Sequence, residues 1–258
     1  MERRVRSQIQ VKLPQSASDE ETFGSTTQAL VVRNGEQPSL FARLTPSQRN
    51  RVIACGVRLS LSGGETLFAQ GGQHKGVYLI QSGLIRTFYT SPAGREITLA
   101  YWPHGNIVGT PQVLGPGIYM WSGIAVSDAE ILAFRGETIR DLMQRIPAFA
   151  IGVVEALEFK GKYLSTLVQM LGTRSVAERL AMLLCSLADL HGIREKEGVA
   201  IGQPFTHEVL AQMVGASRQW VTMTLDRFQR EGLICIAKRR TVILKRQKLL
   251  SRPSSRAD

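Results

Sequence analysis

Residues 205–234, with the sequence FTHEVLAQMVGASRQWVTMTLDRFQREGLI, decide the fold of the C-terminal part of this chain. Thr206 precedes one apolar pattern of helical period, and Ser217, a favourable N-cap, opens a second pattern that ends at Gly232. Between the two patterns, residues 215–217 (Gly-Ala-Ser) supply a tight turn. The apolar positions are Val209, Leu210 and Val214 in the first pattern, and Val221, Leu225 and Phe228 in the second. Two helices joined by a short glycine-containing turn form a helix-turn-helix, whose second helix can enter the major groove of DNA.

The second helix of this motif carries polar side chains on its outer face, near its start. Arg218 has the chemistry to bond guanine O6 and N7, and Gln219 can bond adenine N6 and N7. Residues 233–236 and 241–244 predict two strands around a basic turn, an arrangement typical of the wing of a winged helix. The candidate DNA-contacting residues are Thr206, Ser217, Arg218, Gln219, Thr222, Lys238, Arg239 and Arg240.

The positive charge of the chain is concentrated in the same region. Its 258 residues include 32 Lys and Arg against 21 Asp and Glu, a net charge of +11. Residues 204–248 hold nine of the basic and three of the acidic residues, a net +6. Such a balance suits a polyanionic partner. A basic helical hairpin with a solvated face is the plain alternative, but turn chemistry, spacing, wing and charge all favour the DNA-binding motif.

The N-terminal half follows a different pattern, in which short runs of Val, Ile, Leu, Phe and Tyr alternate with glycine turns over residues 59–133. Gly72, Gly83, Gly94 and Gly105 lie 11 residues apart. This spacing is typical of antiparallel strands in a sandwich or closed roll, and it predicts a β-roll or barrel of about eight strands. Residues 1–35 are polar and lack apolar periodicity, so we expect a flexible leader there.

From residue 136 onward the apolar period becomes helical. Positions from Ala150 to Leu171 step by four and three, as in the a/d seam of a coiled coil. We expect a long helix that pairs with a second copy of the chain, and Gly161 would let the two backbones approach closely. The predicted interface, called the seam below, consists of Val154, Leu157, Gly161, Leu164, Val168 and Leu171. The alternative is that this stripe packs against the chain's own β-roll.

Ser175 and Glu178 have the spacing of a capping box and open a further helix over residues 176–190. Residues 192–204 are turn-rich and charged. The chain is thus predicted to be an α+β protein with a β-roll, a long dimerisation helix and a winged helix-turn-helix. We expect a leader at 1–35, an effector-sensing roll at 36–140, the dimerisation helix at 141–172, the DNA-binding domain at 173–250 and a flexible tail at 251–258.

This order of domains resembles the Crp/Fnr (cyclic-AMP receptor/FNR) family of bacterial transcription regulators, over roughly residues 40–248. The framework GETLFAQGG…VYLIQSGLIR…GREITLAYWPHGNIVG is similar to the family's sensing roll, and VGASRQWVTMTLDRFQREGLI to its recognition motif. The resemblance implies a cupin-like roll of the cyclic-nucleotide-binding-domain fold and a homodimer on an inverted-repeat operator. It also implies contact with RNA polymerase if the protein is an activator.

Two positions of the recognition motif depart from the family. Gln219 stands where Glu is more usual, and Met223 stands where a second base-contacting Arg often occurs. The half-site sequences familiar from the family are therefore not assumed for this chain.

The sensing roll also departs from the nucleotide-binding members. Where those members hold the ribose with Gly-Glu and the cyclic phosphate with Arg-Ser or Arg-Thr, this chain has Gly109-Thr110 and Tyr119-Met120. A buried phosphate without a cationic partner is costly, so we do not expect cyclic AMP as the effector. The leader has no cysteines for an iron–sulfur cluster, and His74 and His104 fit exposed turns better than haem ligation.

An aromatic lining with a few polar groups suits a small apolar or aromatic effector, with an anionic group paired to Lys160. The candidate effector-binding residues are Gly109, Thr110, Tyr119, Met120, Trp121, Lys160 and Tyr163, to which Tyr101, Trp102 and Phe159 add aromatic surface. The segment YWPHGNIVG…GPGIYMW resembles the chlorophenol-responsive members of the family more than the nucleotide-binding members. The alternatives are that these aromatics are core packing, that the protein senses a gas through haem, or that it is an effector-independent regulator controlled by abundance.

Other classes of function find no support in the sequence. We find no phosphate-binding Walker loop, no GxSxG, no HExxH and no CxxC, so we expect neither an enzyme nor a metal site. An architectural DNA-binding protein would share the basic domain but would not need the roll. Neither a secretory signal nor a membrane-spanning run is evident, and the three cysteines are widely spaced, so we expect a cytoplasmic protein without membrane contact.

Overall fold

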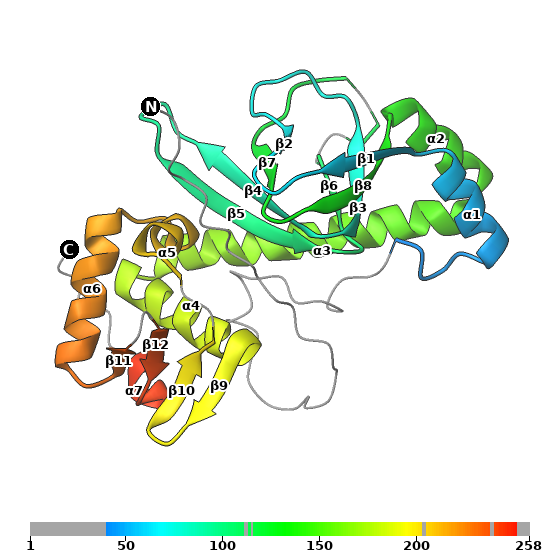
Figure 1. Ribbon diagram of the computed structural model, residues 1–258. Coiled ribbons are helices and arrows are strands. Elements are labelled where there is room, and N and C mark those ends of the chain that lie inside the picture. Colours follow the sequence, from blue (N-terminus) through cyan, green and yellow to red (C-terminus); the bar gives the residue numbers. More distant parts are fainter. Residues whose placement is uncertain (1–39, 111–112, 115, 203–204, 238–239, 252–258) are drawn as a thin grey trace. The chain divides into compact units, whose positions relative to one another are not determined.

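The computed structural model describes residues 40–110, 113–114, 116–202, 205–237 and 240–251 (Figure 1). These residues divide into two compact units. The first unit comprises residues 40–95 and 99–162, and the second comprises residues 96–98 together with those from 163 onward. None of the described helices is long and apolar enough to cross a membrane.

The first unit is built on two four-stranded sheets, with strand orders β1-β8-β3-β6 and β2-β7-β4-β5. Both β1 and β3 pair antiparallel with β8, and both β2 and β4 pair antiparallel with β7. The strands are β1 (Val57–Leu61), β2 (Thr66–Phe68), β3 (Val77–Ser82), β4 (Leu84–Thr90), β5 (Glu96–Pro103), β6 (Ile107–Val108), β7 (Ser122–Ala125) and β8 (Ala129–Phe134). This architecture confirms the predicted β-roll of about eight strands.

One glycine lets the chain pass from the first sheet to the second within a single residue. Gly83 alone separates β3 from β4, and its φ of +85° lies in the left-handed region that side chains with a Cβ rarely adopt. At Gly83, one of the regularly spaced glycines, the positive φ explains why glycine is needed.

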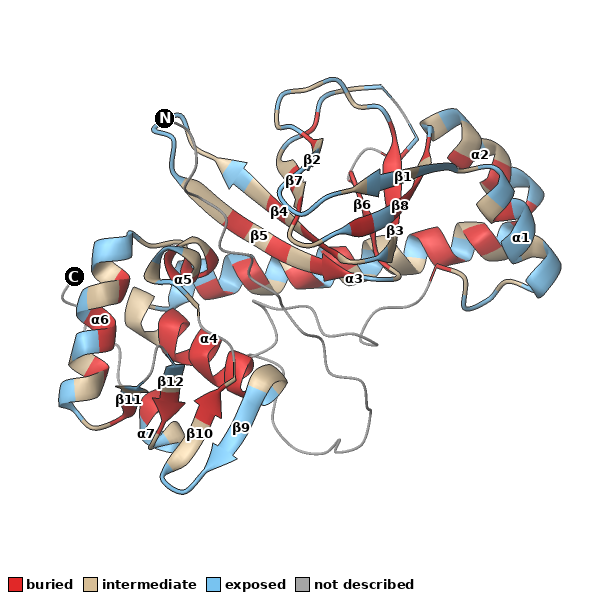
Figure 2. Ribbon diagram, viewed as in Figure 1, coloured by how far each residue is buried: buried red, intermediate tan, exposed pale blue. Residues whose placement is uncertain are grey.

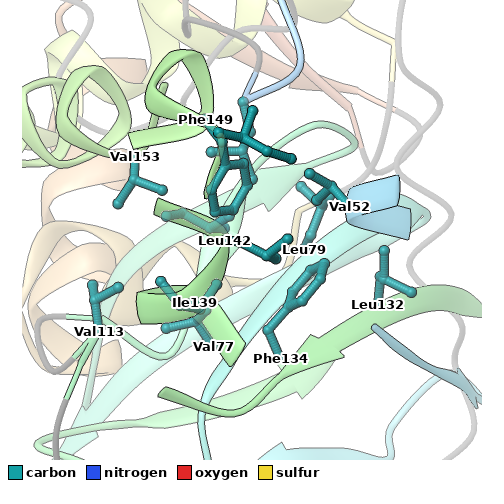
Figure 3. Packing of buried hydrophobic residues seen from close by; sticks show 13 residues of the cluster. Val52, Val77, Leu79, Val113, Leu132, Phe134, Ile139, Leu142, Phe149 and Val153 are labelled. Carbon is teal, nitrogen blue, oxygen red and sulfur yellow. The ribbon is translucent and has the colours of Figure 1, made fainter. Parts of the chain in front are cut away.

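Three helices cover the first sheet and close its hydrophobic core (Figure 3). They are α1 (Pro46–Ala54), α2 (Gly136–Arg145) and the beginning of α3 (Pro147–Thr173). The most buried members of the cluster, each at most 1 % exposed, are Val52, Val77, Leu79, Leu132, Leu142 and Phe149. Because these residues come from α1, both central strands, α2 and α3, the start of α3 is fixed to the roll by burial of apolar surface.

Helix α3 carries two rows of residues that are offset by one position (Figure 2). One row is buried and consists of Phe149, Val153, Lys160, Tyr163, Leu167 and Met170. The neighbouring row is the seam, in which Val154 is 57 % and Val168 68 % exposed, with Leu171 and Gly161 also exposed and Leu157 and Leu164 half-buried. Most of the seam is thus exposed, whereas Leu157 packs against the hydrophobic core cluster of the roll.

The second unit contains the helices α4 (Val176–His191), α5 (His207–Val214), α6 (Arg218–Arg230) and α7 (Arg246–Leu250). Its strands are β9 (Gly192–Glu195), β10 (Gly198–Ile201), β11 (Ile234–Ala237) and β12 (Arg240–Ile243), in the sheet order β11-β12-β10-β9. Helix α4 begins at the predicted capping box, because Ser175 Oγ accepts from the Glu178 amide and Glu178 Oε2 accepts from the Ser175 amide, at 3.3 and 2.8 Å.

The segment at residues 192–204, which the sequence presents only as turn-rich and charged, contains a β-hairpin that the sequence analysis missed. Gly198 pairs with Glu195 and Val199 with Arg194 across β9 and β10. β10 also pairs with β12, at Val199–Ile243 and Ala200–Val242. The wing is therefore part of a four-stranded sheet and not a lone hairpin.

Candidate nucleic-acid interface and sensing roll

The predicted helix-turn-helix is present, formed by α5, a short turn and α6. Thr206 Oγ1 accepts from the Val209 amide and Ser217 Oγ accepts from the Trp220 amide, each at 3.2 Å, so both predicted N-caps are made. Gly215 is the C-cap of α5 and has φ +66° and ψ +41°, the left-handed conformation that glycine favours. Its backbone N–H donates to the Ala211 carbonyl.

Helix α6 is divided into a buried and an exposed face (Figure 2). The buried side chains are Val221, Thr224, Leu225 and Phe228, none more than 1 % exposed. The exposed ones are Arg218, Gln219, Met223, Asp226 and Arg230. Arg218 and Gln219 are therefore free of the core, in the first turn of a helix held by its apolar face.

Thr222, a third predicted base contact, has its hydroxyl bound within the protein. Thr222 Oγ1 donates to the Arg218 carbonyl over 3.0 Å and lies 2.8 Å from Nδ1 of His207. Both contacts are satisfied when His207 Nδ1 carries a proton and donates it to the hydroxyl. His207, which the sequence analysis did not single out, thus connects the start of α5 to the first turn of α6.

The wing carries the remaining predicted contacts. β11 and β12 pair in register from Ile234–Ile243 to Ala237–Arg240, one residue away from the predicted strands. Arg240 is exposed at the first position of β12. Lys238 and Arg239 lie outside the described residues.

A buried arginine joins the helix-turn-helix to the end of α3. Arg179 of α4 is 8 % exposed, and its guanidinium donates to the carbonyls of Val214, Arg174 and Leu171 at 2.9, 2.9 and 3.4 Å. The acceptors lie at the last residue of α5 and around the turn between α3 and α4. The sequence gives no signal for this role, because the acceptors are backbone atoms.

In the sensing roll, the predicted effector residue Tyr119 is buried in an aromatic cluster. Its ring stacks on Phe68 with centroids 4.5 Å apart and lies 4.7 Å from the ring of His74. Its hydroxyl accepts from the Lys75 amide at 3.1 Å, donates to the Gly76 carbonyl at 3.2 Å and lies 3.0 Å from the Tyr78 hydroxyl. Burial, and then the hydrogen bond with the Tyr119 hydroxyl, raise the pKa of Tyr78, so the phenol of Tyr78 stays neutral.

The predicted effector residues near Tyr119 differ in burial and do not form a single cluster. Gly109 is buried with φ +91°, and its carbonyl lies 2.9 Å from His74 Nε2. Thr110 is buried, Trp121 is half-buried and Met120 is 59 % exposed. His104 is exposed. The structure therefore brings Gly109, His74 and Tyr119 together but leaves Met120 in solvent.

Lys160 and Trp102 form a second buried feature of the roll. The ammonium of Lys160 lies 3.3 Å from the centre of the Trp102 ring, and Trp102 Nε1 donates to Thr87 Oγ1 at 2.9 Å. Lys160 is 7 % exposed, and burial lowers its pKa to about 7. Burial also raises the pKa of Tyr163, which follows one turn later on α3. Within the residues described, the Lys160 ammonium has no carboxylate partner, so the aromatic ring is its main stabilising contact.

Comparison with known proteins agrees with both parts of this architecture. Residues 178–252 match the Crp-like helix-turn-helix domain, and residues 58–146 match the cyclic nucleotide-binding domain. The cyclic AMP receptor protein of Thermus thermophilus is 28 % identical over 195 residues, which cover 76 % of this chain and 87 % of that protein.

Two solved structures show the same fold. A CooA variant from Carboxydothermus hydrogenoformans has a TM-score of 0.61 at 25 % identity, covering 77 % of this chain and 88 % of its own. The c-di-GMP-responsive global regulator CLP of Xanthomonas campestris has a TM-score of 0.67 at 19 % identity, covering 77 % of this chain and 99 % of its own.

Together the two matches describe a cyclic nucleotide-binding domain followed by a Crp-like helix-turn-helix domain. The chain belongs to the Crp/Fnr family of transcription regulators and is a DNA-binding protein rather than an enzyme.

Proposed function

We propose that the protein binds an inverted-repeat operator as a homodimer and that a small non-nucleotide effector in the roll controls this binding. The observation that carries the first part is the exposed first turn of α6, where Arg218 and Gln219 project from a helix anchored by a fully buried opposite face. Guanine and adenine are the bases whose major-groove edges match these two side chains.

Fluorescence anisotropy with inverted-repeat and scrambled duplexes, at stated salt, tests specific binding. Arg218→Ala is expected to weaken binding to the operator by about 1–3 kcal/mol while scrambled DNA is bound as before. Arg240→Ala on the wing is expected to weaken both duplexes alike and to reduce the salt slope by about one. Equal losses on both duplexes for Arg218→Ala would contradict base readout by this residue.

The seam supports self-association. Val154 and Val168 present apolar surface to solvent on a helix whose neighbouring row is already buried, and Gly161 has open space around the position of a Cβ. Apolar positions at a and d spacing are stabilised when a second helix covers them.

Sedimentation of Val168→Asp is expected to show a monomer with a folded far-UV spectrum, because a carboxylate cannot be buried in such a seam at low cost. Gln169→Asp, an exposed neighbour outside the seam, is the matched control and should remain dimeric. A dimeric Val168→Asp protein would contradict pairing through this row.

The effector proposal rests on Lys160 and Trp102. A buried ammonium over an indole, without a carboxylate, is a natural counter-ion for an anionic group on an aromatic molecule. The names of the relatives mention cyclic AMP and c-di-GMP. In this chain Tyr119 stands where the nucleotide binders have the phosphate-binding Arg. Its hydroxyl is hydrogen-bonded to Lys75, Gly76 and Tyr78. We therefore favour a non-nucleotide effector, similar to those of the chlorophenol-responsive members.

Native mass spectrometry of the purified protein, followed by thermal unfolding with a panel of small aromatic acids, tests this proposal. An effector is expected to raise the unfolding midpoint of the wild-type chain and not that of Lys160→Met. Stabilisation of both proteins to the same extent would show that the effector does not bind at Lys160.

A further inference from the structure

Met223 occupies the centre of the exposed face of the recognition helix. On α6, successive residues are rotated by about 100°, so Gln219, Met223 and Arg230 fall on one line pointing away from the buried Val221 and Leu225. Met223 is 56 % exposed, whereas the residues of the opposite face are at most 1 % exposed. It is the sixth residue of α6, within the N-terminal half that a helix-turn-helix presents to base edges.

The chemistry of this side chain restricts what it can meet in the major groove. A thioether is at best a weak acceptor and cannot donate a hydrogen bond. Placed over a guanine, adenine or cytosine edge, it would displace water from polar groups without replacing their hydrogen bonds. The thymine C5-methyl is the one apolar group that a base pair exposes in this groove.

Among its neighbours on α6, Met223 is the residue best placed for an apolar contact with a base. Thr222 also has a methyl group, but its hydroxyl is bound to Arg218 and His207, which fixes the side chain toward α5. Gln219 lies one turn before Met223, about 6 Å along the helix axis, which corresponds to about two base-pair steps. An adenine read by Gln219 would therefore lie within about two steps of the base that Met223 contacts.

We propose that Met223 is a specificity-determining residue that packs against the 5-methyl group of one thymine in each operator half-site. This inference rests on the proposed operator binding through α6. It assigns one contact of the recognition helix to apolar packing, about one turn beyond the polar contacts by Arg218 and Gln219.

The experiment removes the methyl group alone. Selection from random duplexes with the full wild-type chain first defines the operator. Each thymine of the half-site is then replaced by deoxyuridine, and dissociation constants are measured for the wild-type chain and for Met223→Ala. One position is expected to weaken wild-type binding about four-fold per half-site, the effect of one buried methyl group. The same replacement should leave the affinity of Met223→Ala unchanged, so that the two changes are not additive.

Two further variants sharpen the test. Met223→Leu keeps an apolar side chain of similar volume and should retain the response to deoxyuridine. Ile193→Ala, at a comparably exposed apolar residue on β9, is the matched control and should respond as the wild-type chain does.

The outcomes separate this inference from the proposed function. A selected operator whose deoxyuridine responses are the same in the wild-type chain and Met223→Ala would overturn the role of Met223 and leave operator binding intact. Selection that enriches no sequence would overturn operator recognition, and the thymine contact with it.

Discussion

Arg179 on α4 donates from Nε to the carbonyl oxygen of Val214, the last residue of α5, over 2.9 Å. The same guanidinium reaches the carbonyls of Leu171 and Arg174 at the turn between α3 and α4. A single buried cation therefore links the end of the long helix to the helix that supports α6.

Replacement of Arg179 by methionine is expected to lower the free energy of unfolding by about 2–4 kcal/mol. It would keep the apolar stem but leave the buried Val214 carbonyl, and two part-buried carbonyls, without their charged donor. Urea unfolding at fixed protein concentration measures this loss. Arg174→Met is the matched control, because Arg174 is exposed and meets Glu178 only at 3.5 Å, and its loss should stay below about 1 kcal/mol. Equal losses in the two variants would contradict the role of Arg179.

Gly215→Ala is expected to destabilise the protein by about 1–2 kcal/mol, because alanine is strained at a φ of +66°. A Cβ at this position would meet Leu171 Cδ2 at an ordinary 3.5 Å, so the loss comes from the backbone and not from a clash. Gly172→Ala, in open space on α3, should be neutral or stabilising in the same chemical unfolding experiment. A loss at Gly172 as large as at Gly215 would show that added bulk, and not φ, is responsible.

Tyr78 and Tyr119 of the roll are expected to differ in how much stability each loses when its hydroxyl is removed. Tyr119→Phe removes a partner from the Lys75 amide, the Gly76 carbonyl and the Tyr78 hydroxyl, so it should cost about 1–3 kcal/mol of stability. Tyr78→Phe removes one contact that the Tyr119 hydroxyl can spare and should cost less. Thermal unfolding of both variants would refute this ordering if Tyr78→Phe proved the more damaging.

The free energy of unfolding is expected to depend on pH through Lys160. In the folded chain its pKa is lowered by burial to about 7, against 10.5 for an ordinary lysine. Between these values the unfolded chain binds the extra proton, so the stability of the wild-type chain rises with pH, by up to about 1.4 kcal/mol per pH unit. Below pH 7, Lys160 is protonated in both the folded and the unfolded chain, so its effect on the free energy of unfolding no longer changes with pH.

The measurement compares urea unfolding of the wild-type chain and Lys160→Met at pH 7.5, 8.5 and 9.5. The variant lacks the titrating group, so the stability difference between the two proteins should move in favour of the wild-type chain as pH rises. A difference that does not change with pH would mean that Lys160 keeps an ordinary pKa in the folded chain.

The parts of the structure that follow from local chemistry were predictable from the sequence. Thr206, Gly215 and Ser217 each act on residues within a few positions, so the helix-turn-helix could be placed with both caps. The β9–β10 hairpin could not, because both strands are only four residues long and β10 also pairs with β12, some forty residues further along the chain. Arg179, His207 and Tyr119 take their roles from partners distant in sequence, which residue spacing does not reveal.

The two rows of α3 have no residue in common. Phe149, Val153 and Lys160 contribute to the interior of the roll, and Val154, Gly161 and Val168 face outward one position later. The two rows meet at Leu157, which belongs to the seam and packs against the core cluster that contains Phe149 and Val153. Under the proposed function, ligand preference and the pairing of two copies would therefore depend largely on different residues of one helix.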